Sequence, residues 1–225
     1  KRGMGVYAGD HRGHGKTAGS PGRIGCIGRD GFNSIVKDGI EITKRIKEEH
    51  PGLPVFLAGH SFGSFVAREY ITMYGTDIAG VVLSGSALIS QAEIKPGIVI
   101  AFIQKAFIGR DVRSRLLNML SFGSYNRRFK SEGSGFAWLS RDREEVEKYV
   151  NDPCCGGVMS AGFYYCFFRA LSALHTPEKL SKIPTGLPVM IMSGSDDPVG
   201  GFGHKVKKLY GEYERLGMKD IGMKL

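Results

Sequence analysis

The fold of this chain is decided by residues 57–64, LAGHSFGS, which contain the pattern G-x-S-x-G. A short apolar run, Leu53–Ala58, leads into the pattern and predicts a buried strand, and Ser64–Tyr74 follows it with the spacing of a helix. In such a strand–turn–helix setting the glycines permit a tight turn, and the serine projects its hydroxyl beyond the carboxyl edge of a sheet. Ser61 is therefore a candidate nucleophile, and a glycine-rich structural turn is the alternative.

Strand and helix patterns alternate on both sides of this stretch. Apolar runs bounded by glycine or proline predict buried strands of a parallel sheet that is covered on both faces. Helical spacing separates them, and this alternation predicts an α/β fold. The further predicted strands are Gly5–Ala8, Ile78–Ser84 and Leu187–Ser193, and the further predicted helices are Phe32–His50 and Val206–Leu216.

Residues at about 90–160 contain no convincing strand. Ile94–Ile108 is apolar with helical spacing, Arg110–Leu120 continues as a basic amphipathic stretch, and Asp142–Val150 is a charged helix. This region is too long for an ordinary crossover with one helix. We therefore expect a helical insertion at about 90–160 within a single domain that spans residues 1–225.

Composition bounds the function classes. Hydrophobic residues make up 42% and charged residues 24% of the chain, which excludes a disordered protein. The net charge of +9 is spread along the chain without an aromatic–basic motif, so no nucleic-acid partner is expected. The apolar stretch Ile98–Ile103 is far too short to span a membrane. Four cysteines without C-x-x-C spacing predict free thiols in a reducing, cytoplasmic setting and no metal or cofactor.

A serine nucleophile needs a base, and the base needs an acid that orients it. The predicted strand Leu187–Ser193 ends beside Asp196 and Asp197, at the sheet edge where α/β folds place their sites. Asp197, directly before a proline, is the better candidate for the acid, and Asp196 is the alternative. The backbone amide of Phe62, at the start of the predicted helix, is positioned to donate to an oxyanion.

The base is not evident in the sequence. In this setting the chain order is serine, acid, histidine. Only His204 follows the acid, and it begins a predicted helix, so an exposed helix-start histidine is the better interpretation. His60 lies inside the turn and is expected to point away from Ser61. His11 and His14 lack the phosphate-loop spacing and a third metal ligand, which favours a structural loop.

Three motifs together carry a resemblance to a known family. Asp10–Gly15, Gly59–Gly63 and Gly194–Val199 resemble the monoacylglycerol lipase and lysophospholipase group of α/β-hydrolases, and Trp138–Asp142 is similar to its bacterial members. The resemblance implies an α/β-hydrolase fold, a mostly parallel sheet flanked by helices, in which the insertion forms a cap over an acyl pocket. It also implies Ser61 as the nucleophile, Asp197 as the acid and the Phe62 amide as an oxyanion donor.

The resemblance implies hydrolysis of carboxylic esters of lipids, monoacylglycerol or lysophospholipid, through an acyl-enzyme on Ser61. The expected partners are a lipid or small ester substrate and, through the apolar stretch Pro96–Ile103 and its basic neighbours, the periphery of a lipid surface. The oligomeric state stays open. The alternatives are a short-chain carboxylesterase or serine aminopeptidase of the same fold, and a non-catalytic binding module that lacks the base.

The resemblance further implies that the N- and C-terminal parts of the fold are incomplete here. Family members begin with further strands, one of which lies between those carrying Asp10 and Ser61, and they end with one more strand and a histidine loop. We therefore expect the second oxyanion donor before Lys1, and both the last strand and the catalytic histidine beyond Leu225. A chain limited to these residues is expected to be inactive.

Overall fold

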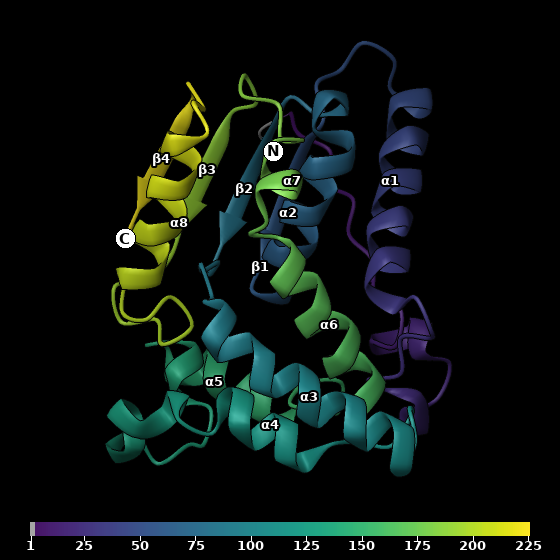
Figure 1. Ribbon diagram of the computed structural model, residues 1–225, viewed down its shortest axis with the longest axis vertical. Coiled ribbons are helices and arrows are strands. Elements are labelled where there is room, and N and C mark those ends of the chain that lie inside the picture. The colour runs from purple at the N-terminus through teal and green to yellow at the C-terminus, as the bar shows by residue number, and fades with distance from the viewer. Residues whose placement is uncertain (1–2) are drawn as a thin grey trace.

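The computed structural model describes residues 3–225, and the first two residues of the chain lie outside its description. A four-stranded, fully parallel sheet forms its centre, with the strands side by side in chain order (Figure 1). The predicted α/β fold is confirmed, and three of the four predicted strands lie in this sheet. The strands are β1 (Phe56–His60), β2 (Gly80–Ser84), β3 (Val189–Met192) and β4 (Ile221–Lys224).

Strand β4 corrects the expectation that no further strand follows the acid. It pairs in parallel with β3, from the Val189–Ile221 partners to the Met192–Lys224 partners. The sequence pattern missed it because four residues that include Gly222 and Lys224 are too few for a period-2 signal.

The prediction of a strand at Gly5–Ala8 is wrong. This segment is extended but pairs with no strand among residues 3–225, and 87% of the Val6 side chain is exposed. A strand needs a neighbour to accept its backbone hydrogen bonds, and β1 forms the edge of the sheet. The Tyr7 hydroxyl instead lies 2.7 Å from His50 Nε2, at the end of the first helix.

Three long helices accompany the sheet: α1 (Gly31–Glu49), α2 (Phe62–Tyr74) and α8 (His204–Arg215). All three were predicted, with ends that differ by at most two residues. Helix α1 packs along α2, where the buried Tyr70 hydroxyl donates to Thr43 at 3.0 Å.

Only one face of the sheet is covered within the part of the chain that the structure describes. Leu83 and Ile191 are register partners on the face toward α2 and α8 and are fully buried. On the opposite face, 66% of Phe56 and 40% of Met190 are exposed. The expectation of a sheet covered on both faces therefore holds for one face, because no described helix packs against the other.

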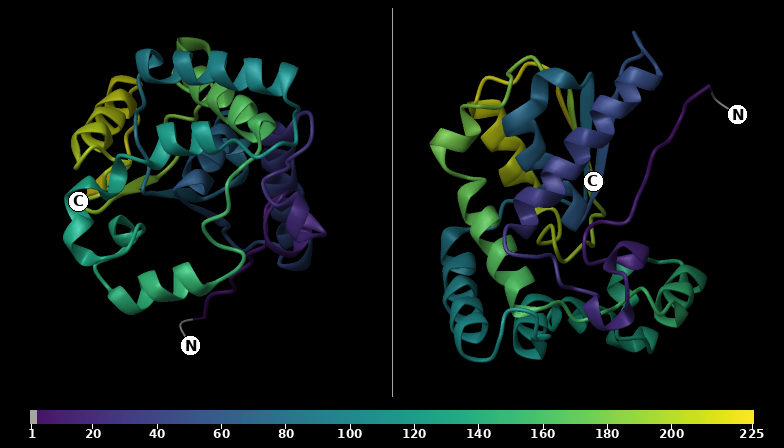
Figure 2. Two further views of the ribbon diagram at one scale, coloured as in Figure 1. Left: turned by 90° about the horizontal axis from the view of Figure 1, so that it is seen from below. Right: turned by 90° about the vertical axis from the view of Figure 1, so that its right-hand side faces the viewer.

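All chain between β2 and β3 is helical or irregular, as predicted for its central part. Figures 1 and 2 show α3, α4 and α5 gathered beyond the carboxyl ends of the strands, while α6, which packs against α3, runs from there back to α7. Helix α6 was not predicted, because its aromatic sequence, AGFYYCFFRALSA, is apolar on every side. The α-helices are α3 (Gln91–Phe107), α4 (Arg115–Phe122), α5 (Arg143–Asn151), α6 (Ala161–Ala173) and α7 (Pro177–Leu180).

Five 3-10 helices complete the structure: η1 (Gly15–Ala18), η2 (Pro21–Arg23), η3 (Gly75–Asp77), η4 (Tyr125–Glu132) and η5 (Ala137–Leu139). The first two lie in the loop before α1, and the last two connect α4 to α5. Across residues 3–225, no helix has both the length and the apolarity to cross a membrane.

Candidate functional site

Ser61 occupies a strained turn between β1 and α2. Its backbone has φ 49° and ψ −118°, in the left-handed half of the map that favours glycine, and such strain costs about 1–3 kcal/mol. The turn is fixed on both sides. The Ser61 amide donates to the Ser84 carbonyl at 2.9 Å, and the Ser61 carbonyl accepts from Ser64 Oγ at 2.6 Å. The serine is thereby held at the carboxyl end of the sheet, as a nucleophile elbow requires.

The two glycines of the turn have different roles. A Cβ on Gly59 would lie 2.3 Å from the carbonyl oxygen of Gly63 and 2.9 Å from the Ser64 Cα, so the strand and helix approach too closely for any side chain. A Cβ on Gly63 would meet only His11 Nε2, at 4.0 Å. Close packing therefore demands a glycine at position 59, and position 63 has free space.

We expect Gly59→Ala to lower the free energy of unfolding by roughly 3 kcal/mol, because the contact is with backbone that cannot move alone. Gly63→Ala is the matched control and is expected to change it by less than about 1 kcal/mol. Urea denaturation of the two variants measures the difference. Equal stability of both would contradict the close approach at Gly59.

Phe62 is the first residue of α2, and the first four amides of a helix have no partner within it. Its ring anchors this helix start in a group of aromatic side chains, with ring-centroid separations between 5.1 and 6.0 Å. This packing holds the start of α2 in place, and a backbone amide at this position suits an oxyanion donor. The surrounding rings belong to His11, His14, Phe32, Phe163 and Phe167.

The histidine loop before α1 lies against this elbow. Within the loop, Thr17 Oγ1 donates to the carbonyls of His11 and His14 at 2.5 and 2.7 Å, and Asp10 accepts from the Lys16 amide at 2.8 Å. These bonds agree with the interpretation as a structural loop. Burial, and then the neighbouring His14, lowers the pKa of His11, so its imidazole is neutral beside Phe62. This contact between residues some 50 positions apart could not be predicted from the sequence pattern.

The structure separates the two candidate acids after β3. Both carboxylate oxygens of Asp197 are held, one by Ser193 Oγ at 2.9 Å and the other by the Val199 amide at 2.8 Å. Asp196 points elsewhere and forms an exposed ion pair with Arg141 at 2.8 Å. A carboxylate held in this way is suited to orient a partner, which favours Asp197 as the acid.

The ends of three strands converge near Asp197. A Cβ on Gly85, which follows β2 with φ 59°, would lie 3.7 Å from Asp197 Oδ2 and 3.3 Å from His60 Cε1. His60 Nδ1 lies 3.0 Å from Ser84 Oγ, its neighbour across the strands. Strands β1 and β3 flank β2, so their ends lie about 10 Å apart. Ser61 directly follows β1 and Asp197 lies five residues after the end of β3, so the two residues stand on either side of the end of β2.

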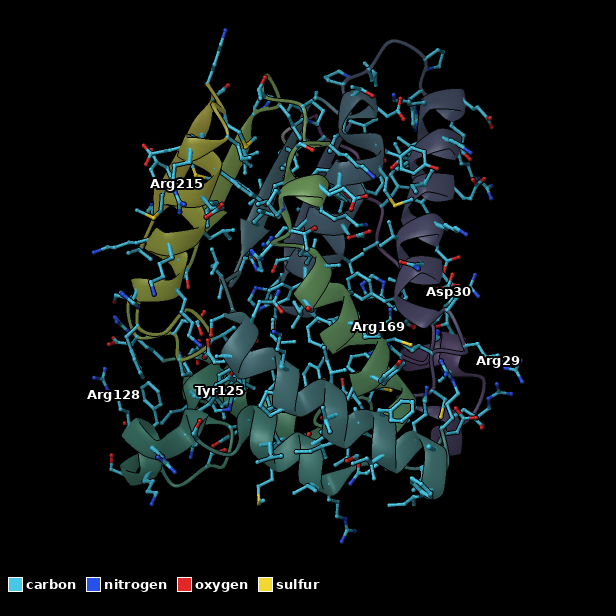
Figure 3. All side chains as sticks on the ribbon, in the orientation of Figure 1. Arg29, Asp30, Tyr125, Arg128, Arg169 and Arg215 are labelled. Carbon is cyan, nitrogen blue, oxygen red and sulfur yellow. The ribbon has the colours of Figure 1, made fainter. Side chains whose placement is uncertain are left out.

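The segment η4 reaches the loop that carries the acid (Figure 3). Burial, together with the charges of Asp197 and Glu93, raises the pKa of Tyr125 to about 12, so this phenol stays protonated. The Arg128 guanidinium lies 3.8 Å from the ring centroid of Phe202. Phe202 has φ 56°, and its amide donates to the Asp197 carbonyl at 2.9 Å. Aromatic and basic side chains of η4 therefore pack against the loop after β3 that carries Asp197.

His204 does not join this site. It is the exposed first residue of α8, and no hydrogen bond links it to Ser61 or Asp197 in the described structure. Within residues 3–225 there is also no group of three or more His, Cys, Asp or Glu side chains that could hold a metal ion. The candidate site thus consists of Ser61, the Phe62 amide and Asp197.

Comparison with known protein families identifies the family of this chain. The sequence model of the serine aminopeptidase, S33, family matches residues 1–221. The chain belongs to this family. Monoglyceride lipase of Homo sapiens is 29% identical over 198 residues, which cover 85% of this chain and 55% of the human protein. Monoacylglycerol lipase of Mycolicibacterium smegmatis is 28% identical over 205 residues, which cover 88% of this chain and 63% of that protein.

Solved structures support the α/β-hydrolase fold. A thermostable carboxyl esterase from Bacillus coagulans, crystallised with glycerol, superposes with a TM-score of 0.86 at 25% identity and covers 96% of this chain and 69% of its own. A soluble variant of monoglyceride lipase from Saccharomyces cerevisiae gives a TM-score of 0.70 at 21% identity, over 96% of this chain and 66% of its own. The chain spans about half the length of the mammalian relatives that it matches.

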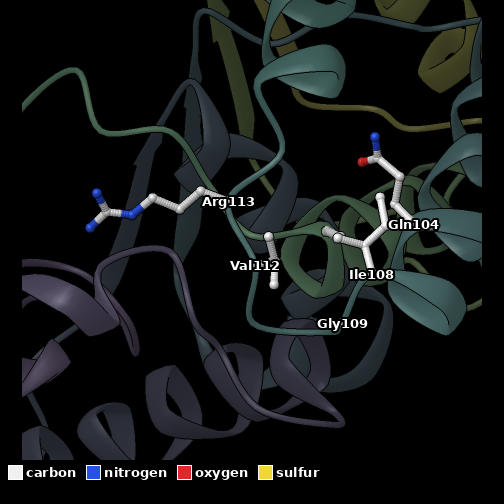
Figure 4. Close-up of a pocket in the computed structure, with 6 residues that line it drawn as sticks. Gln104, Ile108, Gly109, Val112 and Arg113 are labelled. Carbon is white, nitrogen blue, oxygen red and sulfur yellow. The ribbon is translucent and has the colours of Figure 1, made fainter.

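Two hollows of this S33-family chain lie away from the elbow. One, of about 40 Å³, lies between the end of α3 and the following loop, lined by Gln104, Ile108 and Val112 among others (Figure 4). The other, of about 160 Å³, lies between α1 and α2 beside Thr43 and Tyr70. Neither includes Ser61 or Asp197, so neither is a candidate acyl pocket.

Proposed function

We propose that this protein is a serine hydrolase that cleaves carboxylic esters of lipids, monoacylglycerol or lysophospholipid, through an acyl-enzyme on Ser61. The strained turn that holds Ser61 at the start of α2 is the observation that carries the proposal. It is supported by the monoglyceride lipases among the relatives and by the esterase among the structural neighbours.

In this mechanism Ser61 Oγ attacks the ester carbonyl carbon while an imidazole takes its proton. The negative charge on the tetrahedral oxygen is stabilised by the Phe62 amide, a contribution of roughly 3 kcal/mol per donor. Collapse expels the alcohol, which receives the proton, and water then releases the fatty acid by the same steps. Asp197 holds the imidazole in the tautomer that accepts from serine.

The base is a histidine that residues 3–225 do not contribute. Of the six histidines, none is hydrogen-bonded to Ser61 or Asp197 within the described residues. His60 Nδ1 instead lies within hydrogen-bond distance of Ser84 Oγ. We therefore assign the base to a histidine from another part of the whole protein, whose imidazole would bridge Ser61 and Asp197. Activity measurements accordingly require the full-length protein.

We further propose that α3 and α4 contact the periphery of a lipid surface. Both helices expose large apolar side chains, and 82% of Phe107 is exposed. The basic side chains beside these helices contribute less to attraction of a lipid surface than their number suggests, because several of them are bound within the protein. Arg110 and Arg113 donate to carbonyls of the loop before α1, and Lys105 lies 3.8 Å from the ring centroid of Tyr165. The exposed set is Val99, Phe102, Ile103, Phe107 and Ile108 on or just after α3, with Leu116, Met119, Leu120 and Phe122 on α4.

A substrate panel tests the lipid assignment on the full-length protein. We expect kcat/KM to rise at least tenfold from butyryl to long-chain monoacylglycerols, since each buried methylene adds up to about 0.8 kcal/mol. Presenting the substrate in phosphatidylcholine vesicles tests the surface contact, which Phe107→Ser is expected to weaken without changing the hydrolysis of a soluble ester. A preference for the butyryl ester would overturn the lipid assignment in favour of a short-chain carboxylesterase.

Aminopeptidase activity is the second candidate, because the matching family model carries that description. The same panel discriminates when it includes aminoacyl p-nitroanilides beside the esters. We expect the esters to react faster. Faster release of nitroaniline would replace the lipase proposal, and turnover of neither class would indicate a binding module of the same fold.

A further inference from the structure

A buried arginine with no acidic partner lies on the helix that follows the elbow. Only 1% of Arg68, in the middle of α2, is exposed, and no carboxylate pairs with it among the described residues. Its Nη1 donates to the Ala87 carbonyl at 2.9 Å. Its Nη2 lies 3.3 Å from each ring nitrogen of His175. One side chain thus binds two segments that are far apart in sequence.

These two segments are the connections that join the helical region to the sheet. Ala87 lies between β2 and α3, where the chain leaves the sheet, and His175 lies between α6 and α7, where it returns. A second contact joins the ends of α3 and α6 that adjoin these connections. Gln91 donates to the Ser172 carbonyl at 2.7 Å, and Ser172 Oγ donates to Gln91 Oε1 at 2.8 Å. Arg68 is the only one of these side chains that comes from the elbow helix.

The outgoing connection also touches the candidate site. Gly85, two residues before Ala87, packs beside His60 and near Asp197 Oδ2. Through Ala87, Arg68 therefore fixes backbone that adjoins the acid, and through α2 it is rigidly joined to the turn at Ser61.

The chemistry of these contacts suits a positioning role better than packing. A guanidinium stays charged, and burying a charge without a counter-ion carries a desolvation cost of several kcal/mol that an apolar side chain of similar volume avoids. Burial, and then the charge of Arg68, lowers the pKa of His175 to about 3, so the imidazole is neutral and accepts a bond from the guanidinium. The directed bonds of the guanidinium impose a geometry on the two connections that an apolar side chain in its place would not.

We propose that Arg68 is a positioning residue that fixes both connections of the helical region Gln91–Ala173 to the elbow helix and so sets where that region lies relative to Ser61. The consequence for catalysis rests on the proposed function and on the cap over an acyl pocket that the family resemblance implies for this region. The structural consequence does not depend on that function.

Hydrogen–deuterium exchange of the full-length protein tests the structural part. We expect Arg68→Met to speed exchange at least tenfold in peptides that span residues 85–91 and 171–177, and Arg68→Lys, which retains one bond, to give an intermediate value. Thr43→Val is the matched control, since it removes a buried hydrogen bond between α1 and α2 and should leave both peptides unchanged. Unchanged protection of these peptides in Arg68→Met would overturn the proposal.

Kinetics of the same variants separate positioning from loss of folded protein. We expect Arg68→Met to raise KM for a long-chain monoacylglycerol about tenfold while the rate of labelling by a small fluorophosphonate stays within twofold, with partial rescue in Arg68→Lys. A parallel fall in both would assign Arg68 to overall stability alone.

If Arg68→Met does not fold, His175→Phe removes only the contact with the returning connection and is expected to loosen only residues 171–177. If no ester is hydrolysed at all, the proposed function fails, and the exchange result still decides the role of Arg68.

Discussion

Replacing Ser61 with alanine is expected to lower kcat for ester hydrolysis by on the order of 10⁵-fold in the full-length protein, because the acyl-enzyme then cannot form. Residual activity would come from the remaining oxyanion donors and substrate binding. Initial rates with a long-chain monoacylglycerol measure the effect. Retained activity would remove Ser61 from the nucleophile's role.

A second substitution at the same position should act in opposite directions on activity and stability. Ser61 holds φ 49°, which glycine adopts without strain. We therefore expect Ser61→Gly to be as inactive as Ser61→Ala but to unfold with a free energy about 1 kcal/mol higher than the wild type. Thermal melting of the two variants compares them. A destabilised Ser61→Gly would show that the turn is not strained.

Asp197→Asn is expected to lower kcat by on the order of 10⁴-fold, because an amide cannot stabilise the imidazolium and favours the wrong tautomer. Asp196→Asn is the matched control. Its carboxylate is 55% exposed and pairs only with an 84% exposed arginine, so the ion pair contributes at most about 1 kcal/mol and kcat should change less than threefold. The same rate assay on both variants tests the assignment. A larger loss in Asp196→Asn would reverse the two acids.

The parts of the fold that depend on local sequence could be predicted. The elbow is encoded within eight residues, and a strand, a glycine turn and a helix start follow directly from their pattern. Helix α1 was predicted for the same reason, since its apolar side chains repeat along 19 residues and a Pro–Gly pair follows it. These features need no knowledge of what packs against them.

Features that depend on a distant partner could not be predicted. Gly5–Ala8 has the composition of a strand, but pairing is a property of two segments, and none of the described residues pairs with it. Strand β4 exists because β3 lies beside it, although its own four residues give almost no signal. The contact between Arg68 and His175 joins residues 107 positions apart, and neither position stands out in the sequence.

Labelling the full-length protein with a fluorophosphonate, followed by peptide mass mapping, tests the central claim most directly. The reagent reacts far faster with a serine that a functioning base activates than with an ordinary serine. A single phosphonyl adduct on the peptide that contains Ser61, absent in Ser61→Ala, is the predicted result. An adduct on another residue, or no adduct in a folded full-length protein, would contradict the assignment of Ser61 as the nucleophile of a serine hydrolase.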